Sequence, residues 1–396
     1  MFATDILKVL YAPKKVFKQI IENPKYWGVI VVVILFVALQ SAFYYSYFNK
    51  EKYETASPAG TVMGQYTENA TLWATTSGVA VSYDNVDYIN GSTYGNNSLQ
   101  FALSNSNSMF MTLNLNGTVN CGPGNFENLS MRIKQVDPQF SPVNVTLYLY
   151  SANSSTSYFT RDITSDFSAA QMNVWNNLTI AVGSNASSWL NTGNAQWSNI
   201  TGLKLDFVYP SEAKITLRAD AIFFRGPYQT LIDLTGATFP LIIVENNLLQ
   251  YVVQLIFISV LLYALIKGLK GTVTWRPIMV AVGFVLIVAV IQAVIGTIAV
   301  SVLPQVNVPI ETQASVAGEA QTAAINAFQS AFTTFAYVFY AVEIACYVWM
   351  AGLCAIIVRE ISGFNWSKSI GVAAATMTLT FVVVPFLYQL LQVFYL

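Results

Sequence analysis

Five long apolar stretches dominate the pattern along the chain, each near or above the 20 residues that a helix needs to cross a bilayer. They cover Trp27–Phe48, Asn246–Ile266, Pro277–Leu303, Phe328–Val358 and Ser369–Leu396. Aromatic residues such as Trp27, Trp275 and Trp366 lie at their ends, as they do at membrane–water interfaces. The first stretch is longer than the core of a signal peptide, and no small-residue cleavage site follows it. The pattern therefore predicts five transmembrane helices, the first of them a signal anchor.

Residues 55–228 have a different pattern, with short runs of β-forming residues separated by turn residues. The predicted strands cover Leu99–Leu103, Met109–Leu115, Val143–Tyr150, Leu178–Val182, Leu203–Phe207, Ile215–Ala219 and Ala221–Phe224. Turn signals such as Asn90-Gly91 and Asn116-Gly117 punctuate them. Many short strands at regular spacing indicate an antiparallel β-sandwich of the jelly-roll type. We expect three parts: 1–54 with the first membrane helix, 55–228 as the sandwich, and 229–396 as four further membrane helices.

The order of features in the sandwich resembles carbohydrate-binding-module or galactose-binding-like domains. The resemblance is carried by Gly91–Phe101, Trp175–Ile180, Trp197–Phe207 and Arg218–Phe224. It implies glycan binding, and it places Asp220 where related domains carry an acid near a structural calcium. The alternative for Asp220 is a solvated or hydrogen-bonded carboxylate, which we favour. We interpret Trp175 and Trp197 as core or strand-start side chains rather than sugar platforms.

Composition and charge give the predicted helices an orientation. The chain is 54% hydrophobic and only 10% charged, against about 25% charged in an average soluble domain. Basic residues concentrate in the N-terminal arm and in the loops after the second and fourth spans: Lys8, Lys14, Lys15, Lys18, Lys25, Lys267, Lys270, Arg276, Arg359 and Lys368. The connection 304–327 has no basic residue. The positive-inside rule therefore predicts a plasma-membrane, multi-pass protein with a cytoplasmic N-terminus and an extracellular C-terminus.

Glycosylation sequons give an independent check on this topology. Ten Asn-x-Ser/Thr acceptors fall within the sandwich: Asn69, Asn90, Asn96, Asn116, Asn128, Asn144, Asn153, Asn177, Asn185 and Asn199. One further sequon, at Asn365, lies in a loop that we expect to be cytoplasmic. The density of sequons on one side predicts an extracellular glycoprotein and favours an archaeal or eukaryotic cell envelope.

Catalytic chemistry has little support in the sequence. The chain has no His, which excludes His general bases, Ser-His-Asp triads and His metal ligands. Its three Cys, at positions 121, 346 and 354, do not form a metal or redox motif. No pair of carboxylates in the sandwich has a spacing that singles it out for glycoside hydrolysis. We therefore expect no enzymatic activity and no cofactor, apart from the structural calcium for which Asp220 is the candidate.

The membrane segments resemble the Yip family, named for Ypt/Rab-interacting proteins. The resemblance is carried by Pro13–Phe17 and Ile20–Pro24 before the first span, by Leu265–Thr272, and by Arg359–Ile370 before the last span. It implies a scaffold or adaptor in membrane organisation, although a whole inserted domain after the first span departs from the family. Pro13 also opens a basic amphipathic helix of the kind that lies on an anionic inner leaflet.

Glu343 is the one acid in the middle of the fourth span, where an ionisable side chain is costly. Gln254 and Gln292 are intramembrane candidates to bond it, together with Gln389 and Gln392. A hydrogen-bonded clasp between helices is the structural interpretation, and a proton or ion relay is the functional alternative.

Two functions remain open from the sequence. The first is a non-enzymatic cell-surface protein, in which a Yip-like bundle anchors a jelly-roll that binds glycans or cell-envelope proteins. The alternative is a transporter or channel subunit that uses Glu343. The expected partners are the lipid bilayer and glycans or envelope proteins, with no nucleic acid.

Overall fold

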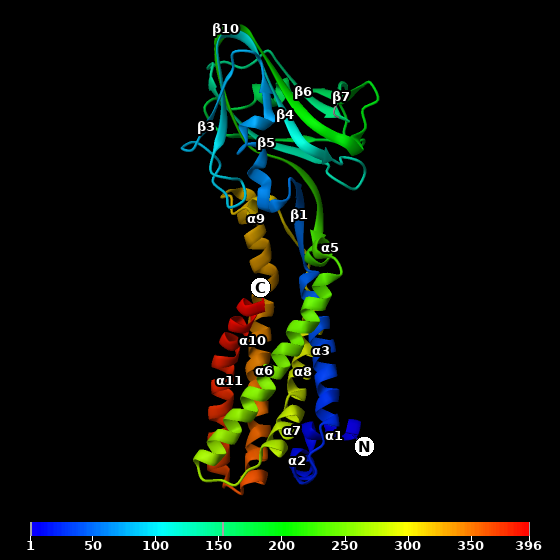
Figure 1. Ribbon diagram of the computed structural model, residues 1–396, viewed down its shortest axis with the longest axis vertical. Coiled ribbons are helices and arrows are strands. Elements are labelled where there is room, and N and C mark those ends of the chain that lie inside the picture. The colour runs from blue at the N-terminus through cyan, green and yellow to red at the C-terminus, as the bar shows by residue number, and fades with distance from the viewer. Residues whose placement is uncertain (1, 153, 396) are drawn as a thin grey trace. The chain divides into compact units, whose positions relative to one another are not determined.

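The computed structural model describes residues 2–152 and 154–395 and divides them into two compact units (Figure 1). The helical unit contains residues 1–51, 230–306 and 328–396. The β unit contains residues 52–229 and 307–327. Residues 307–327, which the sequence pattern placed within the four-helix part, thus belong to the β unit. Polarity explains the difference, because this connection lacks the long apolar run of the spans on either side.

Within the described residues, five helices are long and apolar enough to cross a membrane, and four correspond closely to the predicted spans. The helices are α1 (Phe2–Tyr11), α2 (Pro13–Glu22), α3 (Trp27–Phe48), α4 (Thr164–Ser168), α5 (Leu231–Thr235), α6 (Thr238–Gly268), α7 (Trp275–Val285), α8 (Ile287–Ser301), α9 (Ile310–Gln313), α10 (Glu319–Ser362) and α11 (Trp366–Tyr395). The candidate spans are α3, α6, α7 with α8, α10 and α11. The fourth differs most from its prediction, because α10 begins at Glu319, before the apolar run.

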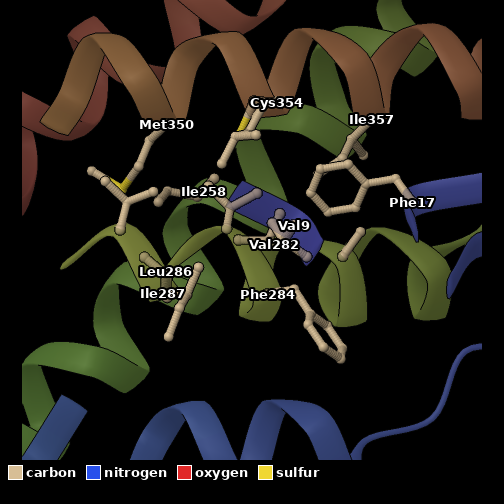
Figure 2. Packing of buried hydrophobic residues seen from close by; sticks show 14 of the residues in the cluster. Val9, Phe17, Ile258, Val282, Phe284, Leu286, Ile287, Met350, Cys354 and Ile357 are labelled. Atoms are coloured by element: carbon tan, nitrogen blue, oxygen red, sulfur yellow. The ribbon is translucent and has the colours of Figure 1, made fainter. Parts of the chain in front are cut away.

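The helical unit packs around α7 and α8. Of the residues in the most apolar window of this pair 72% are buried, against 28–39% in the corresponding windows of the other four candidate spans. Figure 2 shows the interior, where Val282 lies on the side of α7 that faces Met350 and Cys354 of α10, whereas Phe284 points away from α10. Two buried polar groups are bonded within the unit: Asn247 donates to Ser41 at 3.0 Å, and the Tyr251 hydroxyl donates to the Gly283 carbonyl at 3.1 Å. Because most residues in the windows of the other four candidate spans are not buried, these helices leave broad apolar faces uncovered by protein.

The β unit is a single large antiparallel sheet folded into two layers by two long strands, β4 and β10. Its strands are β1 (Glu51–Ser57), β2 (Trp73–Thr75), β3 (Ala80–Asp84), β4 (Ser98–Val119), β5 (Asn128–Asp137), β6 (Asn144–Ser151), β7 (Ser154–Asp162), β8 (Asn176–Ala181), β9 (Leu190–Thr192), β10 (Ile200–Thr230) and β11 (Val306–Val308). Short 3-10 turns cover Gly60–Tyr66, Ala70–Leu72 and Trp197–Asn199.

The register of β10 defines the two layers. Residues 200–208 of β10 pair with β6 and with the second half of β4, and the layer continues through β7 to β9. Residues 215–225 pair with β5 and the first half of β4, and that layer extends to β3 and β8. The strand bends between these halves, where the register shifts around Ala213. Alternate residues such as Leu205, Phe207 and Leu217 point into a common core, as the predicted β-sandwich requires.

A buried ionic cluster fixes the returning segment 307–327 to the sheet. Arg225 of β10 makes two-pronged contacts to Glu54 of β1, at 2.8 and 2.7 Å, and to Glu311 of α9, at 2.9 and 2.9 Å. The three side chains are only 8–14% exposed. The Ile310 amide also donates to Glu54, at 3.1 Å. We call these three residues the Arg225 cluster.

Candidate functional site

The outer face of one layer carries aromatic side chains on neighbouring strands. Phe110 of β4, Lys204 of β10, and Tyr148 and Tyr150 of β6 point away from the core, because their sequence neighbours point into it. Tyr158 of β7 continues the row. All five are partly exposed. We call them, with Asp206, the aromatic face.

Contacts within the aromatic face hold its rings in place. The Lys204 ammonium lies 4.7 Å from the centre of the Phe110 ring and 4.9 Å from that of Tyr148. Tyr158 packs edge-on against Tyr148 and Tyr150, with centroids 5.6 and 6.2 Å apart. Because the rings are tilted to one another, they form an uneven apolar surface edged by hydroxyl groups. Such a surface suits a ligand that has both apolar and hydroxyl-bearing faces.

The electrostatics of the aromatic face are close to neutral. Lys204 donates to Asp206 at 2.7 Å, so its charge is balanced within the face. Burial raises the pKa of the Tyr150 phenol, although Lys204 acts in the opposite direction. The hydroxyl therefore stays protonated near pH 7 and is able both to donate and to accept a hydrogen bond.

The opposite layer carries a polar cluster whose members bond one another. Arg218 contacts Asp84 at 2.7 Å and also pairs with Asp87. Lys134 and the Trp175 indole donate to Asp87 at 2.7 and 2.9 Å. Burial alone would raise the pKa of Asp87, but the hydrogen bonds from Lys134 and Trp175 outweigh it and lower that pKa. The charged groups of the cluster are therefore paired with one another.

The two tryptophans of the carbohydrate-binding-like pattern have structural contacts. Trp175 belongs to the polar cluster, and Trp197 stacks on Phe159 with centroids 3.8 Å apart. Trp189 meets Trp197 edge-on at 5.4 Å. These contacts agree with the interpretation of Trp175 and Trp197 as strand-start and core side chains.

Asp220 is buried, with 1% of its surface exposed, and serves as a hydrogen-bond acceptor. Its carboxylate accepts from the amides of Ile89 and Ala221, both at 2.7 Å, and from the Thr67 hydroxyl at 3.2 Å. Burial raises the pKa of Asp220 to about 7, against the opposing effect of these donors. Within residues 2–152 and 154–395, no three His, Cys, Asp or Glu gather where they could hold a metal ion. In this structure Asp220 is a buried carboxyl group that accepts three hydrogen bonds.

Glu343 lies on α10, close enough to Tyr44 of α3 to interact with it electrostatically. Among the described residues no hydrogen bond joins it to Gln254 or Gln292, and the side chain of Gln392 lies outside the described part. Tyr44 is instead hydrogen-bonded to Gln40. Glu343 thus has an electrostatic interaction with a tyrosine that the sequence pattern did not single out and, within the described part of the chain, no hydrogen bond to Gln254 or Gln292.

The sequon asparagines are exposed or partly exposed wherever the structure describes them. Asn69, Asn90, Asn96, Asn116, Asn177 and Asn185 are exposed, and Asn128, Asn144 and Asn199 are partly exposed. Asn153 lies outside the described residues. The exposed Asn365 is in the connection between α10 and α11.

Comparisons with known proteins give structural neighbours for the sandwich. The family 11 carbohydrate-binding module from Clostridium thermocellum, solved with a beta-1,3-1,4-mixed-linked tetrasaccharide, is 14% identical and covers 41% of this chain and 93% of its own, with a TM-score of 0.28. An exo-beta-agarase is 12% identical over 41% of this chain and 24% of its own, with a TM-score of 0.31. At these TM-scores the likeness carries no argument about function.

No protein-family model matches the chain, and no curated protein matches it. The resemblance of the membrane segments to the Yip family therefore gains no support from these comparisons.

Proposed function

We propose that this protein is a membrane-anchored, non-enzymatic surface protein whose aromatic face binds neutral glycans. The observation that carries the proposal is the row of rings from Phe110 through Tyr148 to Tyr158 on the open side of the sheet. The apolar C–H side of a pyranose ring packs against aromatic rings, while its hydroxyls bond the tyrosine hydroxyls and the Lys204–Asp206 pair. Because that pair leaves little net charge, we assign a neutral rather than an acidic glycan.

The helical unit is proposed to be the membrane anchor, in which a Yip-like arrangement serves as a scaffold. Its support is the set of five candidate spans with large exposed apolar side chains, such as Ile34, Val348 and Phe386. Residues 52–229 and 307–327 belong to one compact unit, and two candidate spans lie between them. An even number of crossings returns the chain to the same side, which is consistent with an extracellular β unit.

Alanine substitution of Tyr148 or Tyr158 tests the binding surface. Screening of the purified full-length protein on a glycan array is expected to find neutral oligosaccharides, and titration of the best one with each variant should show binding weakened about 30-fold, because truncating a central aromatic anchor costs about 2 kcal/mol or more. Tyr83→Ala is the matched control, since Tyr83 is an exposed tyrosine on β3 in the other layer. Unchanged affinity in both test variants would show that the aromatic face is not the glycan-binding surface.

Site-resolved mass spectrometry tests the topology. We expect glycans on several of the ten sequons in the β unit and none on Asn365, because glycosylation enzymes act on the external side. The protein should be isolated from a host that performs N-glycosylation. A glycan on Asn365 would reverse the proposed orientation.

A further inference from the structure

Helix α2 is a basic helix whose apolar side is already covered by protein. Pro13 occupies its first turn, and Val16, Phe17 and Ile20 recur at helical spacing. These three side chains are buried in the same cluster as Ile278 of α7 and Ile357 of α10, and Figure 2 shows Phe17 and Ile357 within that cluster. The apolar side of α2 is therefore not available to enter a lipid leaflet, which corrects the expectation of an amphipathic helix lying on the membrane.

The opposite side of α2 presents Lys14, Lys15 and Lys18, all exposed. In the part of the chain that the structure describes, no hydrogen bond or ion pair involves these three side chains. Four other cations at this end of the helical unit lie against aromatic rings: Arg276 on Tyr26, Lys267 on Tyr263, Arg359 on Trp366 and Lys368 on Phe364. The three α2 lysines are thus positioned for a ligand outside the protein.

Position along the chain places this helix near lipid headgroups, given the membrane anchoring proposed above. Trp27, the start of the first candidate span, lies five positions after Glu22, the end of α2, so at most about 17 Å of chain joins them. Leu7, Tyr11 and Trp27 are 61%, 74% and 68% exposed. Exposed aromatic and aliphatic side chains beside lysines are typical of the interface between headgroups and hydrocarbon.

We infer that the lysine side of α2 binds the headgroups of anionic phospholipids in the adjoining leaflet. The ligand chemistry is a phosphodiester that carries net negative charge, met by three ammonium groups on one rigid helix. Because α2 is fixed by its apolar contacts to α7, it binds as a preformed surface and does not insert.

Lipid retention by the full-length protein tests this inference. The protein is reconstituted in nanodiscs containing one part phosphatidylglycerol to four parts phosphatidylcholine, re-extracted in mild detergent, and its co-purifying lipids are quantified. The wild type is expected to retain phosphatidylglycerol in excess of its share. The triple variant K14Q/K15Q/K18Q should weaken that preference by about fivefold per lysine, and K14R/K15R/K18R should preserve it. Added salt should reduce the preference of the wild type.

Equal retention by the wild type and the triple Gln variant would overturn the inference, as would loss of retention in the triple Arg variant. A wild type that enters nanodiscs but shows no preference overturns this inference alone, since the anchoring stands. A wild type that fails to enter nanodiscs overturns the anchoring and the inference with it. A glutamine variant that keeps its lipids but loses a co-purifying acidic protein assigns the lysines to that protein and also overturns lipid binding.

Discussion

Replacing Arg225 by Met is expected to destabilise the β unit by about 3–5 kcal/mol, because it leaves two buried carboxylates without their cation. Glu54 and Glu311 are 8% and 9% exposed, so water cannot fully replace the guanidinium. For a unit of this size the loss corresponds to a fall in melting temperature of roughly 6–20 °C. Differential scanning calorimetry of the full-length protein in detergent measures it.

Two further variants make this result specific. Lys214→Met removes a cation whose side chain is 65% exposed and whose pair with Asp137 spans 3.0 Å, so we expect a change of about 0–1 kcal/mol. The triple variant E54L/R225M/E311L removes all three charges and should be milder than R225M alone, because no buried charge is left unpaired. If R225M melted like Lys214→Met, the Arg225 cluster would be only a peripheral contact.

Phe207→Ala is expected to cost about 3–5 kcal/mol of stability, whereas Phe110→Ala should cost little stability and weaken glycan binding. The two phenylalanines lie on adjacent rungs of the β4–β10 pair and face opposite sides of the layer. Phe207 is fully buried and meets Phe167 edge-on at 5.1 Å, so truncating it opens a cavity. Phe110 lies on the aromatic face beside Lys204.

Calorimetry and glycan titration on both variants separate the two roles. Phe207→Ala that still folds at low temperature should bind with near wild-type affinity, since its ring does not reach the aromatic face. A large loss of stability in Phe110→Ala would mean that Phe110 is a core side chain and that the outward direction assigned to it is wrong.

The spans and strands were predictable because their signals are local. A continuous apolar run such as Trp27–Phe48 indicates by its length where a membrane-spanning helix begins and ends. The span predicted there has the same bounds as α3. The alternation in Val143–Tyr150 separates the buried Val145, Leu147 and Leu149 from the outward Tyr148 and Tyr150. That alternation is the sequence signal for the aromatic face, because it indicates which side chains of the strand point outward.

The Arg225 cluster was not predictable in the same way. Glu54, Arg225 and Glu311 are single charged residues in three distant segments, and no spacing rule connects them. The same holds for the neighbourhood of Glu343. The sequence indicates glutamines as its partners because of their residue type, whereas the fold brings Tyr44 within electrostatic range. Burial and pairing of isolated charges depend on the tertiary fold, which a periodic pattern does not encode.

The β unit is formed by two separate segments of the chain, and this affects the order in which its parts are synthesised. Residues 230–306 are synthesised between the two segments of this unit, so Arg225 emerges well before Glu311. At about 5–20 residues per second, the delay is roughly 4–17 s. During that interval the nascent sandwich has one of the two carboxylates that Arg225 needs, and its completion waits for the synthesis of two more candidate spans. The rate of translation thereby sets a minimum time for the completion of the β unit. Slow translation of residues 230–306 would lengthen the period in which a chaperone has access to the unfinished domain.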